Sequence, residues 1–173
     1  PTVGRGAGDE CGIIAGVLHT DGTVTVTDDD SGKGNPDEWG ERVVRLADRV
    51  GASRIIVEGD QGGEVHRSTL QLAAQRVGVG LPPVKVLWTA KWGKGRSDKA
   101  SRAQWAAGEY HRVFHADALR GGLLEVQQLS WVPGRSGVSP DRVDALGWLL
   151  FEMFGGASRR AVSSGPGVPP RVR

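Results

Sequence analysis

The stretch Ser139-Pro140-Asp141-Arg142-Val143-Asp144-Ala145-Leu146 places two carboxylates at the start of an apolar helix. Ser139 suits the N-cap position and Pro140 the first helical position, and the apolar residues that follow predict that the helix continues. Asp141 and Asp144 then share one face of the first turn, where the helix dipole favours negative charge. The two acids therefore either complement the helix terminus or belong to a site that other segments complete.

A third acid ends a predicted strand. Residues 54–58 (RIIVE) form a β-branched run that closes on Glu58, and the glycine-rich loop 59–63 leads from it into a helix. In α/β sheets ligands bind beyond the carboxyl ends of strands, so Glu58 lies where a functional acid is expected, although a solvated glutamate is the alternative. If this strand end and the 139–146 helix start face one crevice, the acids converge and need a cation between them.

Convergent carboxylates predict Mg²⁺ or Mn²⁺, because hard cations prefer oxygen ligands. The sequence contains no HExxH pattern, no Walker A motif and no nucleophile elbow. Cys11 is its only cysteine, which excludes an intrachain disulfide and a thiolate cluster and favours a reducing cytoplasm. Divalent ions at such acids activate water and stabilise the leaving oxygen of a phosphodiester, so nucleic-acid hydrolysis is the expected chemistry.

Basic residues gather between residues 91 and 102, although the formal net charge of the chain is only +2. This stretch spans a predicted loop and the start of the helix behind it, and a helix N-terminus with adjacent basic side chains is a phosphate-binding arrangement. A solvated surface loop would show the same pattern. The residues that we expect to contact DNA phosphates are Lys91, Lys94, Arg96, Lys99 and Arg102.

The order of the remaining segments predicts an α/β fold. A β-hairpin over 11–27 and a helix from Pro36 come first, and strands then alternate with helices up to the helix that follows Ser139. Such alternation favours a mixed central β-sheet flanked by α-helices. We place one domain at residues 1–154 and a flexible basic tail at 155–173.

The predicted helix over residues 119–129 has an apolar stripe that is expected to face the core. Its members are Leu123, Leu124, Val126 and Leu129.

Four blocks of this sequence resemble the C-terminal nuclease domain of tailed-phage large terminases. Their order and spacing match over roughly residues 1–154, and the blocks are Asp9–Ile14, Ile56–Gly63, Lys99–Arg102 and Ser139–Leu146. The resemblance implies a ribonuclease H-like fold and a two-metal-ion endonuclease that cuts concatemeric double-stranded DNA during genome packaging. It places the family's second acid on Glu58 and its last on Asp144, with Asp141 as a neighbouring ligand or helper.

The same resemblance implies an upstream packaging ATPase domain, portal and small terminase proteins as partners, and the cytoplasm of an infected bacterial host as the location. No apolar run approaches membrane-spanning length. The family's first acid is an aspartate that ends the first strand and is commonly followed by proline. Because this sequence starts at Pro1, that strand and its aspartate are expected upstream of it, and metal binding by the given residues is expected to be weak.

Two alternatives stay open. One is a junction resolvase or transposase-like nuclease, and the other is a non-catalytic DNA-binding or assembly module.

Overall fold

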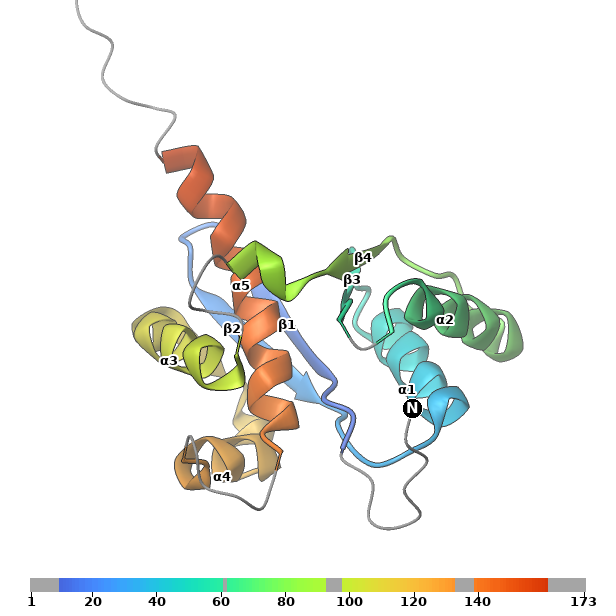
Figure 1. The fold of residues 1–173 in the computed structure, drawn as a ribbon, viewed down its shortest axis with the longest axis horizontal. Coiled ribbons are helices and arrows are strands. Elements are labelled where there is room, and N and C mark those ends of the chain that lie inside the picture. The colour runs from blue at the N-terminus through green and yellow to red at the C-terminus, as the bar shows by residue number, and fades with distance from the viewer. Residues whose placement is uncertain (1–9, 61, 93–97, 133–138, 162–173) are drawn as a thin grey trace, which may run out of the picture.

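The computed structural model describes residues 10–60, 62–92, 98–132 and 139–161 (Figure 1). Its strands are β1 Ile14–Leu18, β2 Val24–Asp29, β3 Ile55–Glu58, β4 Val84–Leu87 and β5 Val113–His115. Its α-helices are α1 Pro36–Arg49, α2 Glu64–Val77, α3 Lys99–Glu109, α4 Leu123–Ser130 and α5 Asp141–Ala161. The predicted alternation of strands and helices is confirmed.

The strands form two pieces. In the first, the order is β1-β2-β5, with β1 antiparallel and β5 parallel to β2, so this piece is mixed as predicted. In the second, β3 pairs in parallel with β4. Within the described residues β1 pairs only with β2 and β3 only with β4, so each keeps one edge without a strand partner. The expected additional strand upstream of Pro1 stays a prediction.

Local signals explain where helix α1 begins. Asn35 accepts hydrogen bonds from the backbone N–H groups of Asp37 and Glu38, both at 3.0 Å, and the Glu38 carboxylate accepts the Asn35 N–H at 2.9 Å. This reciprocal capping box satisfies N–H groups that have no partner inside the helix. With Pro36 as the first helical residue, the predicted start of α1 is confirmed.

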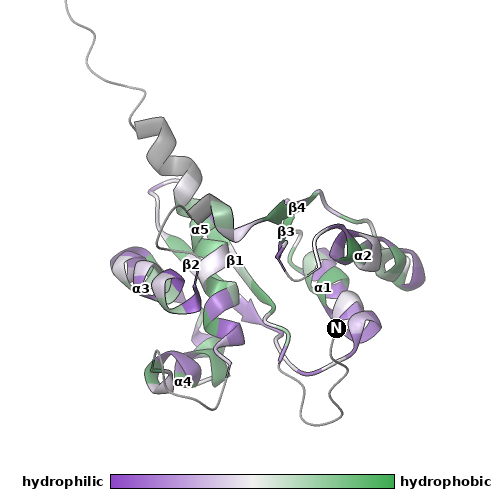
Figure 2. Cartoon of the chain, in the orientation of Figure 1, coloured by the Kyte–Doolittle hydropathy of each residue, from purple (hydrophilic) through white to green (hydrophobic). Residues whose placement is uncertain are grey.

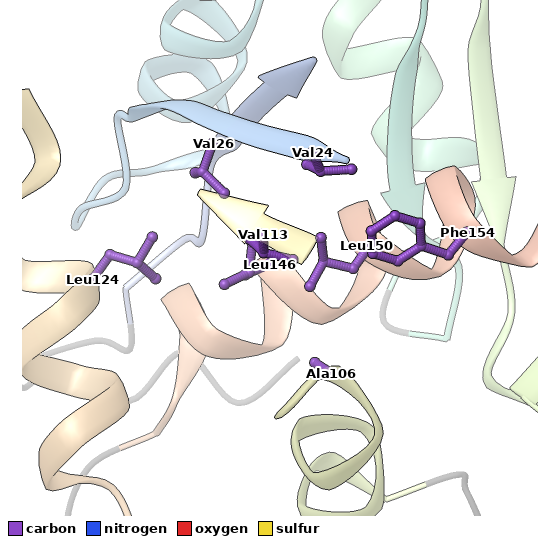
Figure 3. Packing of buried hydrophobic residues seen from close by; sticks show 8 residues of the cluster. All are labelled: Val24, Val26, Ala106, Val113, Leu124, Leu146, Leu150 and Phe154. Atoms are coloured by element: carbon purple, nitrogen blue, oxygen red, sulfur yellow. The ribbon is translucent and has the colours of Figure 1, made fainter. Parts of the chain in front are cut away.

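Helix α5 packs against both pieces of the sheet and so places its first turn relative to β3. Its buried residues Leu146, Leu150 and Phe154 lie in one cluster with residues of β2, β5, α3 and α4, all labelled in Figure 3: Val24, Val26, Val113, Ala106 and Leu124. On the other side, Trp148 packs against Leu87 of β4. Figure 2 shows α5 as largely hydrophobic along its middle and hydrophilic at its first turn.

A separate core lies between α1, α2 and the β3–β4 piece. Its buried members include Val44, Ile55 and Leu70. The two helices cover this piece away from α5, as Figure 1 shows.

One prediction about the C-terminal half needs correction. Of the expected core stripe in α4 only Leu124 is buried, whereas Leu123, Val126 and Leu129 are exposed, because this short helix packs at the periphery against α5 and the turn 117–119. Helix α5 continues through Ala161, past the expected domain boundary at residue 154, and the predicted division into a domain and a flexible tail stays a prediction. Residues 162–173 lie outside the described residues. No helix in the described part of the chain is long and apolar enough to span a membrane.

Candidate functional site

Two of the three predicted acids face the same cation. Glu58 is the last residue of β3 and Asp144 lies in the first turn of α5. The Arg102 Nη2 atom lies 3.7 Å from Glu58 Oε1 and 2.7 Å from Asp144 Oδ1. The structure therefore brings together acids that are far apart in the sequence, as the sequence analysis expected.

Arg102 of α3 holds Asp144 through two parallel hydrogen bonds. Its Nε donates to Oδ1 and its Nη2 donates to Oδ2, both at 2.8 Å, which is the strong bidentate geometry of an arginine–carboxylate pair. The guanidinium also lies over the Trp148 ring, 5.3 Å from its centroid. Arg102 is only 2% exposed. In this structure the guanidinium is buried and faces Asp144, and the predicted contact of Arg102 with a DNA phosphate stays a prediction.

Asp141, the third acid, pairs with Lys99 at the more open side of the cluster. The Lys99 ammonium lies 3.0 Å from Asp141 Oδ1 and 4.0 Å from Asp144 Oδ2, and it donates a 2.9 Å hydrogen bond to Ser139 Oγ. Ser139 in turn donates to Asp141 at 2.6 Å. Lys99 thus contacts the acids, and its predicted contact with DNA phosphate stays a prediction.

The start of α5 is capped by a residue that sequence reasoning missed. The Gln127 side-chain oxygen in α4 accepts hydrogen bonds from the backbone N–H groups of Arg142 and Val143, at 2.9 and 3.1 Å. The predicted Ser139 cap is wrong, because the Ser139 hydroxyl faces Asp141 and α5 begins after Pro140. No local signal could have found Gln127, since it reaches the helix end from another element.

Burial shifts the acidity of both central carboxyls. It raises the pKa of Glu58, and the negative charge of Asp144 raises it further, against the opposing effect of Arg102 and Lys99. Burial also raises the pKa of Asp144, although Arg102 and Lys99 again act in the opposite direction. Both carboxyls therefore hold a proton to higher pH than free side chains do.

The cluster does not form a divalent-metal site as it stands. Arg102 lies between Glu58 and Asp144, where a shared metal ion would have to lie, and Lys99 occupies the side next to Asp141. Across the described ranges, no group of three or more His, Cys, Asp or Glu side chains could hold a metal ion. Internal cations, rather than a metal geometry, satisfy the charge of these acids.

The remaining predicted DNA contacts cannot be placed. The backbone of Lys91 lies in the short 3-10 turn Thr89–Trp92, but its side chain lies outside the description. Lys94 and Arg96 also lie outside the described residues.

Comparisons with known proteins identify the fold. No protein-family model matches the chain, and no curated protein matches it significantly. Among solved structures, the yeast mitochondrial Holliday junction resolvase Ydc2 aligns with a TM-score of 0.51 and 10% identity, over 88% of this chain and 79% of that chain. Thermus thermophilus RuvC aligns with a TM-score of 0.43 and 16% identity, over 84% and 89%. The chain has the ribonuclease H-like α/β fold, with a mixed sheet flanked by helices.

Proposed function

We propose that this chain is the endonuclease domain of a phage large terminase, which hydrolyses phosphodiester bonds of concatemeric double-stranded DNA with Mg²⁺ or Mn²⁺. The observation that carries the proposal is the approach of Glu58, at the carboxyl end of β3, to Asp144, in the first turn of α5, within a ribonuclease H-like fold. The four sequence blocks that resemble terminase nuclease domains support the finer assignment.

The acids, the arginine and the lysines have different proposed roles. Glu58, Asp144 and Asp141 are the acids proposed to face the divalent cation, whose preference for oxygen ligands they match. Arg102 is a positioning residue, because its bidentate pair orients the Asp144 carboxylate. The proposed phosphate contacts on double-stranded DNA are Lys91, Lys94, Arg96 and Lys99. An upstream ATPase domain, the portal and the small terminase are further proposed partners.

Plasmid cleavage in MnCl₂ tests the proposal. Glu58→Gln keeps the size of the side chain and removes its charge, and we expect it to lower the cleavage rate by about 10²-fold or more, a range typical of losing one key electrostatic group. The matched control is Glu41→Gln, because Glu41 of α1 takes part in long pairs with Arg45 at 3.6 Å and with Arg76 of α2 at 3.8 Å. Equal cleavage by the two variants would contradict the assignment of Glu58.

A junction resolvase is the second candidate function. The fold likeness to the Ydc2 resolvase favours it, at a sequence identity of 10%. A four-way junction and a linear duplex of the same sequence, offered in competition, separate the two candidates. We expect cleavage of both substrates at similar rates, whereas a strong preference for the junction would replace the terminase proposal.

The same assays address a non-catalytic module. In a module without a catalytic metal ion, the charge of the acids has to be balanced by cations of the chain itself. The pairs of Lys99 with Asp141 and of Arg102 with Asp144 provide this balance. DNA binding by a folded chain that cleaves neither substrate at any Mn²⁺ concentration would favour this third function.

A further inference from the structure

Trp88 lies at the carboxyl end of β4 and is partly open to solvent. It directly follows Leu87, the last residue of the strand, and it is 44% exposed. The strand register pairs Leu87 with Glu58, so Trp88 lies one residue beyond the acid at the same edge of the sheet. With about 4.8 Å between strands and about 3.3 Å per residue, the Cα atoms of Glu58 and Trp88 are about 6 Å apart. A partly exposed aromatic ring therefore lies beside the candidate site.

The indole of Trp88 packs against two glycines. A methyl group at Gly59 would lie 2.7 Å from Cδ2 and 2.8 Å from Cε2 of Trp88, and one at Gly63 would lie 3.2 Å from Cη2. Cδ2 and Cε2 form the bond that the two rings share, so an atom close to both lies over a face of the indole. Gly63 has a φ of 47°, in the left-handed region that favours glycine. Because Gly59 has no side chain, its backbone can support one face of the ring directly.

Hydrogen bonds fix the backbone on both sides of this ring. The Gly59 N–H donates to the Leu87 carbonyl at 2.6 Å, which ties the glycine loop to the end of β4. The Asp60 carboxylate accepts a hydrogen bond from the Thr89 N–H at 2.8 Å. The ring of Trp88 is therefore held in place before any ligand binds, which lowers the entropic cost of binding.

Trp88 and Glu58 reach this edge from opposite faces of the sheet. Leu87 packs against Trp148 of α5, and because side chains alternate along a strand, Trp88 points to the face covered by α2. Glu58 instead faces Arg102, which lies over the Trp148 ring. A nucleic-acid strand that crosses the carboxyl ends of β3 and β4 would pass both residues.

We propose that Trp88 is a stacking platform for one unpaired base of a DNA substrate. This inference rests on the proposed function, because it takes DNA to lie at Glu58. At about 3.4 Å per nucleotide of a stacked strand, the base lies within about two nucleotides of the phosphodiester that faces Glu58. Every base has a flat π-face, so the ring accepts an unpaired base of any identity. The favoured substrate is duplex DNA with an unpaired base near the cleaved bond.

The cost of unpairing explains why an unpaired base is favoured. Removing an aromatic platform lowers affinity by about 5- to 150-fold for each stacked base. Extracting a base from an intact duplex costs about as much as this contact returns, whereas a base that is already unpaired incurs little of that cost. We therefore expect the wild type to bind a duplex with a one-base bulge about tenfold more tightly than the intact duplex.

Fluorescence anisotropy with end-labelled duplexes tests the proposal in EDTA, where metal-dependent cleavage does not occur. Trp88→Leu keeps an apolar side chain that cannot stack, so it should lose the preference for the bulge, whereas Trp88→Phe should keep most of it. The matched control is Phe114→Leu, because Phe114 is 56% exposed but belongs to β5 in the other piece of the sheet. This control should keep the full preference.

Three results would overturn the proposal. The first is equal binding of the two duplexes by the wild type, which would assign the exposed ring to another kind of partner. The second is an undiminished preference in Trp88→Leu. The third is an equal loss of preference in Phe114→Leu, which would show that the effect does not depend on the place of the ring.

A bulge that carries 2-aminopurine tests the contact itself, because stacking on an aromatic ring quenches the fluorescence of this base. We expect saturating wild type to quench it, and Trp88→Phe, with its smaller ring, to quench it less. This measurement decides the matter if thermal unfolding shows that Trp88→Leu does not fold. Unchanged fluorescence at saturation would contradict the stacking.

The inference and the proposed function can fail separately. A bulge preference that Trp88→Leu loses, in a chain that never cleaves DNA in MnCl₂, would refute only the function. Cleavage that depends on Glu58, by a protein without any bulge preference, would refute only the inference.

Discussion

Two arginine clusters lie beside the first turn of α5, and they differ in how completely they are closed. The Arg142 cluster consists of Arg142, Glu10, Asp29 and the carbonyl of Ser31. In it, Arg142 donates to Glu10 at 2.9 Å, to Asp29 at 2.6 Å and to the Ser31 carbonyl at 3.2 Å, so its three donor nitrogens reach three different acceptors. This cluster ties α5 to β2 and to the segments that precede and follow the β1–β2 hairpin.

The Arg102 cluster consists of Arg102, Asp144 and Glu58, and it is less closed. Asp144 takes both strong hydrogen bonds, whereas Glu58 is 3.7 Å away with 27% of its side chain exposed. It also lies at the carboxyl end of a parallel strand, where ligands bind in α/β sheets. The comparison teaches that an arginine with two carboxylates is not itself a functional signal. The Arg102 cluster differs from the Arg142 cluster in its position in the fold and in the longer distance of one carboxylate, Glu58, from the arginine.

The largest expected effect concerns the closed cluster. Arg142→Met leaves Asp29, whose side chain is 6% exposed, without its cation. Breaking a buried ion pair on one side costs about 3–5 kcal/mol, so we expect urea unfolding to show a loss of that size. Arg45→Met is the control, because Arg45 is 64% exposed in a 3.6 Å surface pair and should change stability by less than about 0.5 kcal/mol. A loss below about 1 kcal/mol for Arg142→Met would show that this cluster is not closed.

The next effect tests what the two clusters share, which is the start of α5. Gln127→Ala removes the acceptor for the N–H groups of Arg142 and Val143 and should lower the free energy of unfolding by about 1–2 kcal/mol, the usual cost of losing a helix cap. Gln128→Ala is a poor control because Gln128 contacts Tyr110, so Gln104→Ala on the exposed face of α3 is preferred. Equal stability of the two variants would mean that water caps α5 adequately.

A smaller effect tests whether the charge of Glu58 in the Arg102 cluster is only partly balanced by its neighbours. Burial and Asp144 raise the pKa of Glu58, so the folded state prefers the protonated carboxyl. The stabilisation that this gives is present below the unfolded pKa of about 4.3 and is lost as pH rises through the higher folded pKa. Denaturant titrations should therefore show that Glu58→Gln becomes more stable relative to the wild type as the pH rises from 3 to 7. A loss of relative stability over this range would show that Glu58 is well paired.

The smallest effect has the opposite dependence on pH. It concerns α3, the helix that carries Arg102 and Lys99. Hydrogen bonds from the backbone and side chain of Ser101 lower the pKa of Asp98, which caps α3. Its contribution is present above the unfolded pKa of about 3.9 and is lost as pH falls through the lower folded value. Asp98→Asn keeps a capping side chain but does not titrate, so its stability relative to the wild type should rise as pH falls towards 2. A constant difference would contradict the role of the charge.

Much of the fold was predictable because its signals are local. The cap at Asn35 with Pro36 after it, and the β-branched run that ends at Glu58, each act through neighbours in the chain and appear in the structure as expected. The α4 stripe failed for the opposite reason. Periodicity shows that Leu123, Leu124, Val126 and Leu129 share a helical pattern, but only packing decides that Leu124 is the one that is buried.

The sequence alone determined which acids matter to the hypothesis and in which elements they lie, because strand ends and helix starts are marked by residues close by. Only the tertiary structure decided what those acids contact. Arg102 appeared as a DNA contact in the sequence and became the buried partner of Asp144, and Gln127 became the cap of a helix in another part of the chain. Such contacts depend on how α3 and α4 pack against α5. A local pattern of residues carries no information about how segments far apart in the sequence pack together.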